Sequence, residues 1–353
     1  MKMNGIYTRN EKDVRKNRSI EFFRFFFIVM ICVWHFSDKV SVFKHGYLGV
    51  EFFFILSGAL LLRSIELHPE IGALDYTIKK FLRFFPKYFA SLIPIFVLVN
   101  YMWAENLNFE TIVDISFRFI SESFMLQNVG IFPGGSNYPL WYLCVLLYGG
   151  GIIYSVLKRN KIWALGVLFP IFVIISYTYI FSNHNSCIEL WGNSNGIYNP
   201  FIRGMADMCL GVLLMAFITH KRSFLCNHLQ MVNMLSMLGI CGIVAQSLIK
   251  PFHDQYVLLF VPFILVACFL DNTILNRLFC QRIWGELGSL SFEMFLIHAF
   301  VIKLFSHTIM QIISIPWLVV CCYITTVIIC AFLFKKILHS IWHQTGSGAY
   351  HHR

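Results

Sequence analysis

Residues 315–334, IPWLVVCCYITTVIICAFLF, are twenty consecutive residues without a charge. A helix that crosses a bilayer needs roughly 20 apolar residues, so this stretch alone predicts a transmembrane helix. The rest of the chain has a similar composition, since 58% of its 353 residues are apolar or aromatic and only 13% are charged. These proportions exclude an ordinary soluble domain and a disordered chain. Because the apolar stretches are continuous rather than alternating, they disfavour a β-barrel.

Apolar segments of this kind recur along the whole chain. We place ten of them, at 20–37, 47–65, 81–103, 140–157, 162–181, 203–220, 231–249, 255–271, 285–306 and 315–338. The sequence therefore predicts an all-α, polytopic integral membrane protein with about ten transmembrane helices. Residues 20–338 are expected to form one membrane domain, between a basic N-terminal segment (1–19) and a C-terminal tail (339–353).

The basic residues predict how these helices are oriented. The chain has 28 Lys and Arg against 18 Asp and Glu, a formal net charge of +10. With a cytoplasmic N-terminus, 21 of the 28 fall in segments on the cytoplasmic side and six on the outer side, while Arg24 lies within the first span. Lys and Arg gather in the cytoplasmic loops of membrane proteins, so both termini are predicted to be cytoplasmic. This distribution explains the positive charge without a nucleic-acid partner.

The eleven cysteines lie mostly inside apolar segments, and none has a neighbour at the spacing of a zinc site. We interpret them as small hydrophobic residues. The sequence predicts neither a disulfide framework nor a metal site.

The longest outer connection is 104–139. Within it, residues 111–126 mix apolar side chains with Asp114, Arg118 and Glu122 at i, i+4 spacing. Two interpretations are open: a helix lying on the outer membrane surface, or a solvated loop with some helix.

The first span carries two polar residues, Arg24 and His35. Eleven residues of α-helix make about three turns, so both side chains lie on one face, separated by about 16 Å along the axis. Arg24 is then near the cytoplasmic edge and His35 is in the outer half. Ionisable residues at membrane depth are candidates for a functional site. The alternative is that Arg24 extends to the interface and His35 is a hydrogen-bonded core residue.

The next two spans place further charges at the same two depths. Glu51 begins the second span near the depth of His35, where a carboxylate would fix the tautomer of the imidazole; otherwise it is a charge at the membrane boundary. Lys80 and Arg83, with Lys79 and Lys87, begin the third span near the depth of Arg24. Such a basic cluster either contacts lipid headgroups or binds the phosphates of a cytosolic ligand.

Five elements of the chain together resemble the integral membrane acyltransferase family 3. The first is Arg24, ten residues, then His35, in RSIEFFRFFFIVMICVWHF at 18–36. The others follow in the family's order: GVEFFFILSG at 49–58, KFLR at 80–83 with Pro86, PLWYL at 139–143, and GSLSFEMFLIHAFVI at 288–302. Each is weak alone, but in this order and spacing they form a strong signal.

Two positions depart from the family pattern. Lys80 replaces an arginine, which keeps the charge but loses the planar fork that binds phosphate through two nitrogens. Residues 144–147 (CVLL) replace the Glu-Glu-Gln stretch that follows the tryptophan in some members. The second departure argues against the branch that carries an attached hydrolase-like domain.

The resemblance implies an O-acyltransferase of the bacterial cytoplasmic membrane. Such an enzyme moves an acyl group, commonly acetyl, from cytosolic acyl-CoA to a hydroxyl, usually of an envelope carbohydrate at the outer face. Acyl-CoA is then a co-substrate, and no permanently bound cofactor or metal is expected. The acceptor, the oligomeric state, and the choice between direct transfer and a covalent intermediate stay open.

The layout of the polar residues, read with this resemblance, predicts three groups. Arg24, Lys80 and Arg83 would bind the acyl-CoA, and His35 would act as general base with Glu51 as its orienting partner. Five further residues would line or support the acceptor pocket: Trp141, Arg203, Asp207, Glu293 and His298.

For four of these five residues, a purely structural role is an open alternative. Arg203 and Asp207 are spaced to pair with each other on one helix. Trp141 would stack on a sugar or anchor the membrane interface, and His298 would make only a structural hydrogen bond.

Two alternatives concern the function as a whole. The protein could be a transporter or flippase of a glycan or lipid-linked substrate, although the sequence shows no inverted repeat. The same fold could also use succinyl-CoA or another donor.

Overall fold

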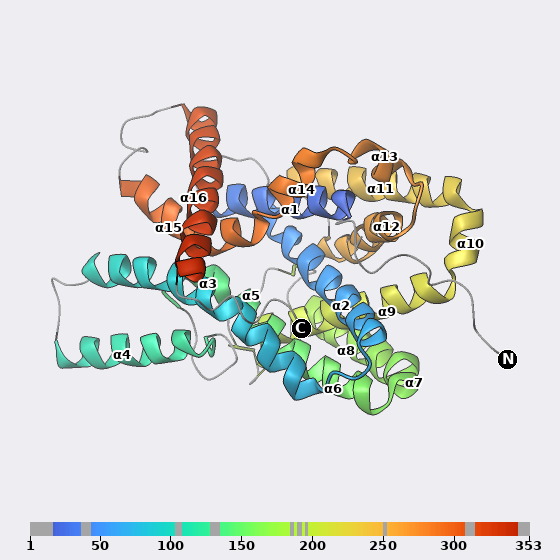
Figure 1. Ribbon diagram of the computed structural model, residues 1–353, viewed down its shortest axis with the longest axis horizontal. Helices are drawn as coiled ribbons and strands as arrows, with labels where there is room; N and C mark the ends of the chain where they lie inside the picture. The colour runs from blue at the N-terminus through green and yellow to red at the C-terminus, as the bar shows by residue number, and fades with distance from the viewer. Residues whose placement is uncertain are drawn as a thin grey trace.

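The structure is a computed structural model that describes residues 17–36, 44–102, 108–127, 135–183, 187–188, 193–194, 197–249, 253–307 and 315–344. The first half of the described chain contains α1 (Arg18–His35), α2 (Gly49–Leu67), α3 (Ala73–Met102), α4 (Phe109–Ser123), α5 (Trp141–Cys144), α6 (Gly150–Arg159), α7 (Lys161–Trp163) and α8 (Phe169–Asn183). Two short antiparallel strands follow, β1 (Asn193–Ser194) and β2 (Ile197–Tyr198). The second half contains α9 (Asn199–His220), α10 (Arg222–Asn227), α11 (Leu229–Leu248), α12 (Val257–Phe269), α13 (Ile274–Leu278), α14 (Arg282–Gly288), α15 (Ser291–His307) and α16 (Pro316–Gln344) (Figure 1).

The predicted all-α polytopic membrane fold is confirmed. Within the described ranges, seven helical stretches are long and apolar enough to cross a membrane, or eight if α14 and α15, bent by 50°, form one span. The other two of the ten predicted segments are also helical. Segment 20–37 corresponds to α1, which contains Arg18, Glu21 and Arg24, and segment 255–271 corresponds to a shorter apolar helix, Asp254–Phe269. The predicted number of about ten transmembrane helices is therefore larger than the seven or eight that are long and apolar enough by this measure.

Aromatic side chains hold α1 in the interior of the bundle. Phe27 stacks on Phe52 of α2, with ring centroids 4.4 Å apart. Phe36, which follows α1 directly, stacks on Tyr323 of α16 at 4.6 Å. Stacked aromatic pairs combine a large buried area with a defined geometry. The end of α1 that carries His35 is thereby fixed against two neighbouring helices.

Helices α2 and α9 approach each other closely because each has a glycine at the crossing. A Cβ atom placed on Gly58 would overlap the carbonyl of Met208, and one placed on Gly211 would overlap the carbonyl of Ile55. Small residues at such a crossing let the backbones of membrane helices come together. This close crossing helps to determine which polar residues of the two helices meet.

We expect Gly58→Ala to destabilise the protein by about 1–3 kcal/mol, the usual cost of overpacking, because the added methyl must push two backbones apart. Thermal unfolding of the purified protein in detergent would measure the loss as a lower Tm. Gly166→Ala is the matched control, since no atom lies within 4 Å of the Cβ that it adds. Equal Tm values for the two variants would contradict the close crossing.

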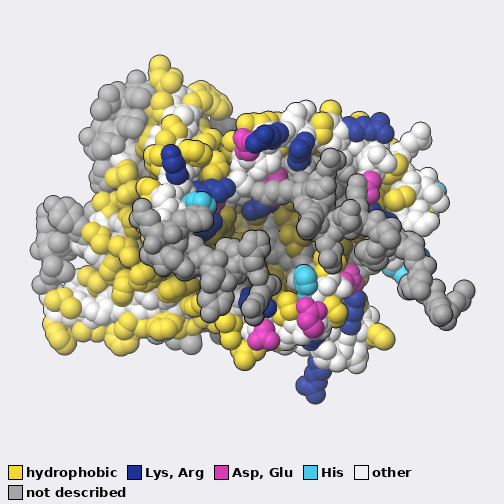
Figure 2. Space-filling view, viewed as in Figure 1, with side chains coloured by type: hydrophobic (Ala, Val, Ile, Leu, Met, Phe, Trp, Pro, Cys, Tyr) yellow, Lys and Arg dark blue, Asp and Glu magenta, His cyan; other side chains and the backbone are white. Residues whose placement is uncertain are grey.

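Helix α4 confirms that the outer connection contains a helix, over Phe109–Ser123. Asn108 caps its N-terminus by accepting a hydrogen bond from the Thr111 amide at 2.8 Å. The helix lies beside α3 and runs antiparallel to it (Figure 1). Several large apolar side chains of α4 are exposed: Phe109, Ile112, Phe117, Ile120 and Phe124. Hydrophobic side chains cover this part of the surface (Figure 2), as an interfacial helix requires.

Candidate active site

The imidazole of His35 lies where three elements meet. His35 is the last residue of α1, and its ring stacks on that of His298 in α15, with centroids 5.2 Å apart and planes inclined by 28°. The ring of Tyr138, just before α5, meets His35 edge-on at 5.0 Å. The structure thus brings together the two histidines that the sequence places 263 residues apart.

The hydrogen bond of His298 fixes its tautomer. Its Nδ1 lies 2.8 Å from the backbone carbonyl of Phe295. A carbonyl oxygen only accepts, so Nδ1 carries the proton and Nε2 keeps its lone pair. Nε2 is buried and has no hydrogen-bond partner among the described residues. A proton-accepting nitrogen therefore lies beside His35.

Glu51 is bound by Arg203 rather than by His35. The Arg203 Nε donates to Glu51 Oε1 at 2.5 Å, and a second guanidinium nitrogen contacts the same carboxylate. The carboxylate and the guanidinium are 0% and 3% exposed, so this is a fully buried ion pair. Among the described residues, no hydrogen bond or ion pair joins Glu51 to His35. The expected orienting role of Glu51 is therefore corrected to an ion pair between α2 and α9.

Asp207 extends this buried cluster without pairing with Arg203 through a hydrogen bond. The hydroxyl of Tyr177 in α8 donates to Asp207 Oδ1. Trp141 is 6% exposed, with the Arg203 guanidinium 6.0 Å from its ring centroid. Such a distance is typical of a cation–π contact. Trp141 is therefore a buried support of the cluster and does not anchor the membrane interface.

The three predicted donor-binding residues come from two helices: Arg24 from α1, and Lys80 and Arg83 from α3. Arg24 binds Glu21, one helical turn away, with NH1–Oε distances of 2.9 and 3.2 Å. The Lys80 ammonium donates to the Tyr76 hydroxyl at 3.0 Å and lies against Gly150 of α6. Arg83 is exposed on α3, with its guanidinium 5.6 Å from the ring of Phe84. Arg83 is thus the most available cation of the three.

Glu293 contacts one of the basic residues of α3. Its carboxylate is 2% exposed and forms an ion pair with Lys87 of α3, at 2.6 Å between Nζ and Oε1. Five residues along α15 separate Glu293 from His298, a rise of about 7.5 Å. Glu293 thus joins α15 to α3 through an ion pair, whereas His298 lies against His35.

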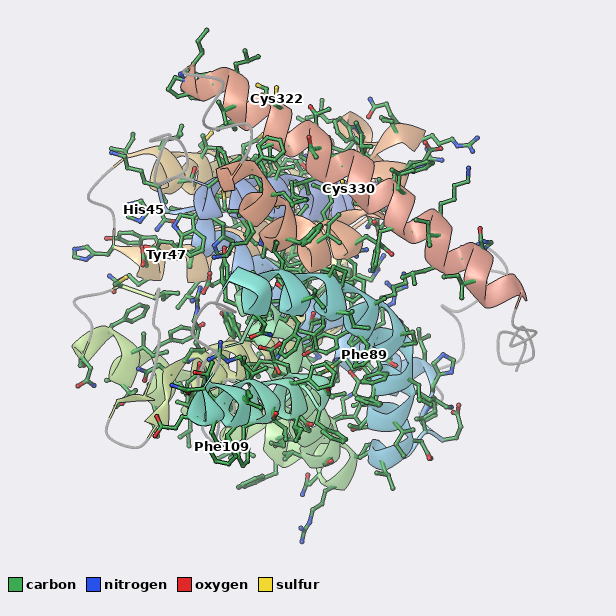
Figure 3. The ribbon with its side chains drawn as sticks, turned by 90° about the vertical axis from the view of Figure 1, so that its left-hand side faces the viewer. His45, Tyr47, Phe89, Phe109, Cys322 and Cys330 are labelled. Atoms are coloured by element: carbon green, nitrogen blue, oxygen red, sulfur yellow. The ribbon has the colours of Figure 1, made fainter. Side chains whose placement is uncertain are left out.

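A further polar cluster surrounds the carboxylate of Asp254, and the sequence did not predict it. The Tyr47 hydroxyl donates to Asp254 Oδ2 at 2.8 Å, and the Ile188 amide donates to the same oxygen at 2.8 Å. His45 Nδ1 lies 2.9 Å from the Tyr47 hydroxyl (Figure 3). Three segments far apart in the chain are tied to one carboxylate. No spacing rule could connect these segments, since their contact depends on how the helices pack.

Comparison with known proteins agrees with this arrangement. A family profile described as an acyltransferase domain matches residues 17–336. No curated protein and no solved structure matches the chain. The matched range includes both histidines, the buried Glu51–Arg203 pair and the basic residues at the start of α3. The chain therefore belongs to the acyltransferase family 3, a family of membrane acyltransferases.

Proposed function

We propose that this protein is an O-acyltransferase of the bacterial cytoplasmic membrane, with both termini in the cytoplasm. It takes an acyl group, most readily acetyl, from cytosolic acyl-CoA and transfers it to a hydroxyl of an envelope carbohydrate at the outer face. The observation that carries the proposal is the contact of the His35 ring with that of His298, whose buried Nε2 has no hydrogen-bond partner in the described part of the chain. A proton acceptor in the water-poor interior is what hydroxyl activation requires.

The reaction proceeds by attack of the acceptor oxygen on the thioester carbonyl carbon. His35 takes the hydroxyl proton as the new C–O bond forms. The C–S bond then breaks, and the CoA thiolate leaves and receives that proton. The acyl group ends on the carbohydrate oxygen, and CoA is released as the free thiol. Histidine suits both proton transfers because its ordinary pKa lies near neutrality.

The basic residues at the start of α3 and in α1 bind the donor. Arg83 is exposed, Lys80 lies between α3 and Gly150 of α6, and Arg24 binds Glu21 within α1. Cations of this kind bind phosphate oxygens through charge-assisted hydrogen bonds. Arg24 lies about 16 Å along α1 from His35, so the thioester arm of acyl-CoA must extend along the bundle to reach the histidine.

Inverted membrane vesicles that contain the protein test the proposed function directly, because they expose its cytoplasmic face. Labelled acetyl-CoA is supplied outside, and label is sought in the glycan fraction. We expect transfer with the protein and none in vesicles that lack it. Glycan movement across the vesicle membrane without consumption of acetyl-CoA would instead support a transporter. Transfer from succinyl-CoA but not acetyl-CoA would correct the donor.

We expect Arg83→Ala to raise the KM for acetyl-CoA by about tenfold or more while kcat changes little. The reason is that a charge-assisted hydrogen bond contributes about 1.5–3 kcal/mol to binding. Initial rates of transfer at varied acetyl-CoA concentration in the same vesicles would measure both constants. Lys221→Ala is the matched control, since it removes an exposed charge at the end of α9. An unchanged KM in the Arg83 variant would remove this residue from the donor site.

A further inference from the structure

A cluster of buried polar side chains lies where α4 ends and the chain approaches α5. It consists of Glu122, in the last turn of α4, with Gln127 and Asn137, and each of these residues is 1% exposed. The proposed transfer step uses none of them. The cluster lies in the outer connection, whose role the sequence left open.

Hydrogen bonds hold these three residues in place. The Ser136 amide donates to Glu122 Oε1, and Asn137 Nδ2 donates to the Leu296 carbonyl of α15 at 3.0 Å. Gln127 Nε2 donates to the Tyr88 hydroxyl of α3 at 2.8 Å, and that hydroxyl in turn donates to the Glu122 carbonyl. The cluster is therefore tied to α3, α4 and α15.

Gly135 makes the close approach of the chain to Glu122 possible. A Cβ placed on Gly135 would lie 2.9 Å from Glu122 Oε1 and 3.6 Å from Gln127 Cγ. A contact of 2.9 Å is shorter than real Cβ atoms make, so a side chain here would displace Glu122. The same glycine thus shows that the Glu122 and Gln127 side chains lie side by side.

One oxygen of each side chain is left over. Glu122 Oε2, Gln127 Oε1 and Asn137 Oδ1 are buried and have no hydrogen-bond partner among the described residues. Buried polar atoms normally have a partner, and an unpaired one is unfavourable. All three atoms are hydrogen-bond acceptors. Their complement is a molecule that donates hydrogen bonds, such as one with several hydroxyl groups, whereas a phosphate or carboxylate would bring further acceptors.

The state of Glu122 suits a neutral ligand. Burial raises the pKa of the Glu122 carboxyl to about 7, although the hydrogen bonds from Ser136 and the charge of Arg118 act in the opposite direction. Near neutral pH the carboxyl is therefore partly protonated. In that form it donates a hydrogen bond as well as accepting one, and each sugar hydroxyl needs both kinds of partner.

The cluster adjoins the two histidines. Asn137 is followed directly by Tyr138, whose ring meets His35 at 5.0 Å. The carbonyl that binds Asn137 belongs to Leu296, two residues before His298 in α15. A molecule held by the cluster would have a hydroxyl near the position where His35 accepts a proton.

We propose that Glu122, Gln127 and Asn137 form the subsite that binds the hydroxyl groups of the carbohydrate acceptor beside His35. This inference rests on the proposed acyl transfer for its biological role. The binding of a sugar at the cluster can nevertheless be measured without any reaction.

The first measurement is direct binding of neutral methyl glycosides to the purified full-length protein in detergent. Saturation-transfer NMR with methyl glucoside, galactoside, mannoside and rhamnoside reports which sugar contacts the protein. We expect binding of at least one of these, and at least tenfold weaker binding in Glu122→Ala. Glu122→Gln keeps an oxygen for the Ser136 amide, so it tests the carboxyl if the alanine variant fails to fold. Glu110→Ala, an exposed carboxylate on the same helix, is the control and should bind normally.

The second measurement is the vesicle assay with the same variants. We expect Glu122→Gln to need at least tenfold more glycan for half-maximal transfer, with an unchanged KM for acetyl-CoA. Unchanged glycoside binding and unchanged glycan dependence in the Glu122 variants would overturn the subsite, as would a wild-type protein that binds none of the four glycosides. Glycoside binding that depends on Glu122 in a protein without transfer activity would keep the subsite and reject the proposed reaction.

Discussion

Replacing His35 with alanine is expected to lower the rate of acyl transfer by about 10²–10⁴-fold, the usual contribution of a general base. The side chain lies at the end of α1 between His298 and Tyr138, and its loss leaves the acceptor hydroxyl without that base. The backbone is held independently by Phe27 and Phe36, so the variant should fold. Initial rates with labelled acetyl-CoA in inverted vesicles, at matched protein amounts, would measure the loss.

Two further histidine variants show whether the effect belongs to His35. His228→Ala removes an exposed histidine outside the cluster and should leave the rate unchanged. His298→Ala should lower the rate less than His35→Ala does, because His298 then only supports the ring stacked on it. A full rate in His35→Ala with loss in His298→Ala would assign the base to His298, whose Nε2 makes no hydrogen bond to any described residue and could serve the same chemistry.

Replacing Glu51 with leucine is expected to destabilise the protein by about 3–5 kcal/mol. The substitution leaves the Arg203 guanidinium, 3% exposed, without its ion-pair partner at the crossing of α2 and α9. The free energy of unfolding of the purified protein, measured with a graded denaturant in detergent, would report the change. Glu286→Leu is the control, because Glu286 pairs with Arg282 on the surface and such pairs contribute 0–1 kcal/mol.

The double variant Glu51→Leu with Arg203→Met tests whether this ion pair serves only the fold or also acyl transfer. Removing both charges should restore most of the stability, since a buried ion pair replaced by apolar side chains of similar size is often neutral. If stability returns and acyl transfer returns with it, the pair serves the fold. If stability returns without transfer, the pair has a role at the site beyond packing. A single Glu51→Leu variant as stable as wild type would contradict the buried pair.

Much of the fold could be predicted from the sequence because hydropathy is a local property. Every predicted segment is mainly helical, and residues 316–338 of the last apolar run lie within α16. The eleven-residue spacing placed Arg24 and His35 on one face of α1, since helical periodicity depends only on neighbours along the chain. The late helix motif indicated His298 in the same way, through residues adjacent in sequence.

The partners of the buried charges could not be predicted in this way. The i, i+4 spacing favoured an Arg203–Asp207 pair, but the structure pairs Arg203 with Glu51. The reason is the close crossing of α2 and α9 at Gly58 and Gly211, which brings the two helices together where these charges lie. A spacing rule considers the residues of one helix only, so it cannot predict a contact between two helices.

The sequence by itself determined that this chain is a helical membrane protein of an acyltransferase family. It also placed Arg24 and His35 on one face of the first helix, near its two ends. Only the tertiary structure decided that His298 meets His35, that Lys87 binds Glu293, and that Glu122 lies beside Gln127. The physical reason is the range of the forces involved. Burial in a bilayer acts on each segment separately, whereas ion pairs and hydrogen bonds need two atoms within a few ångströms. Backbone packing sets such distances.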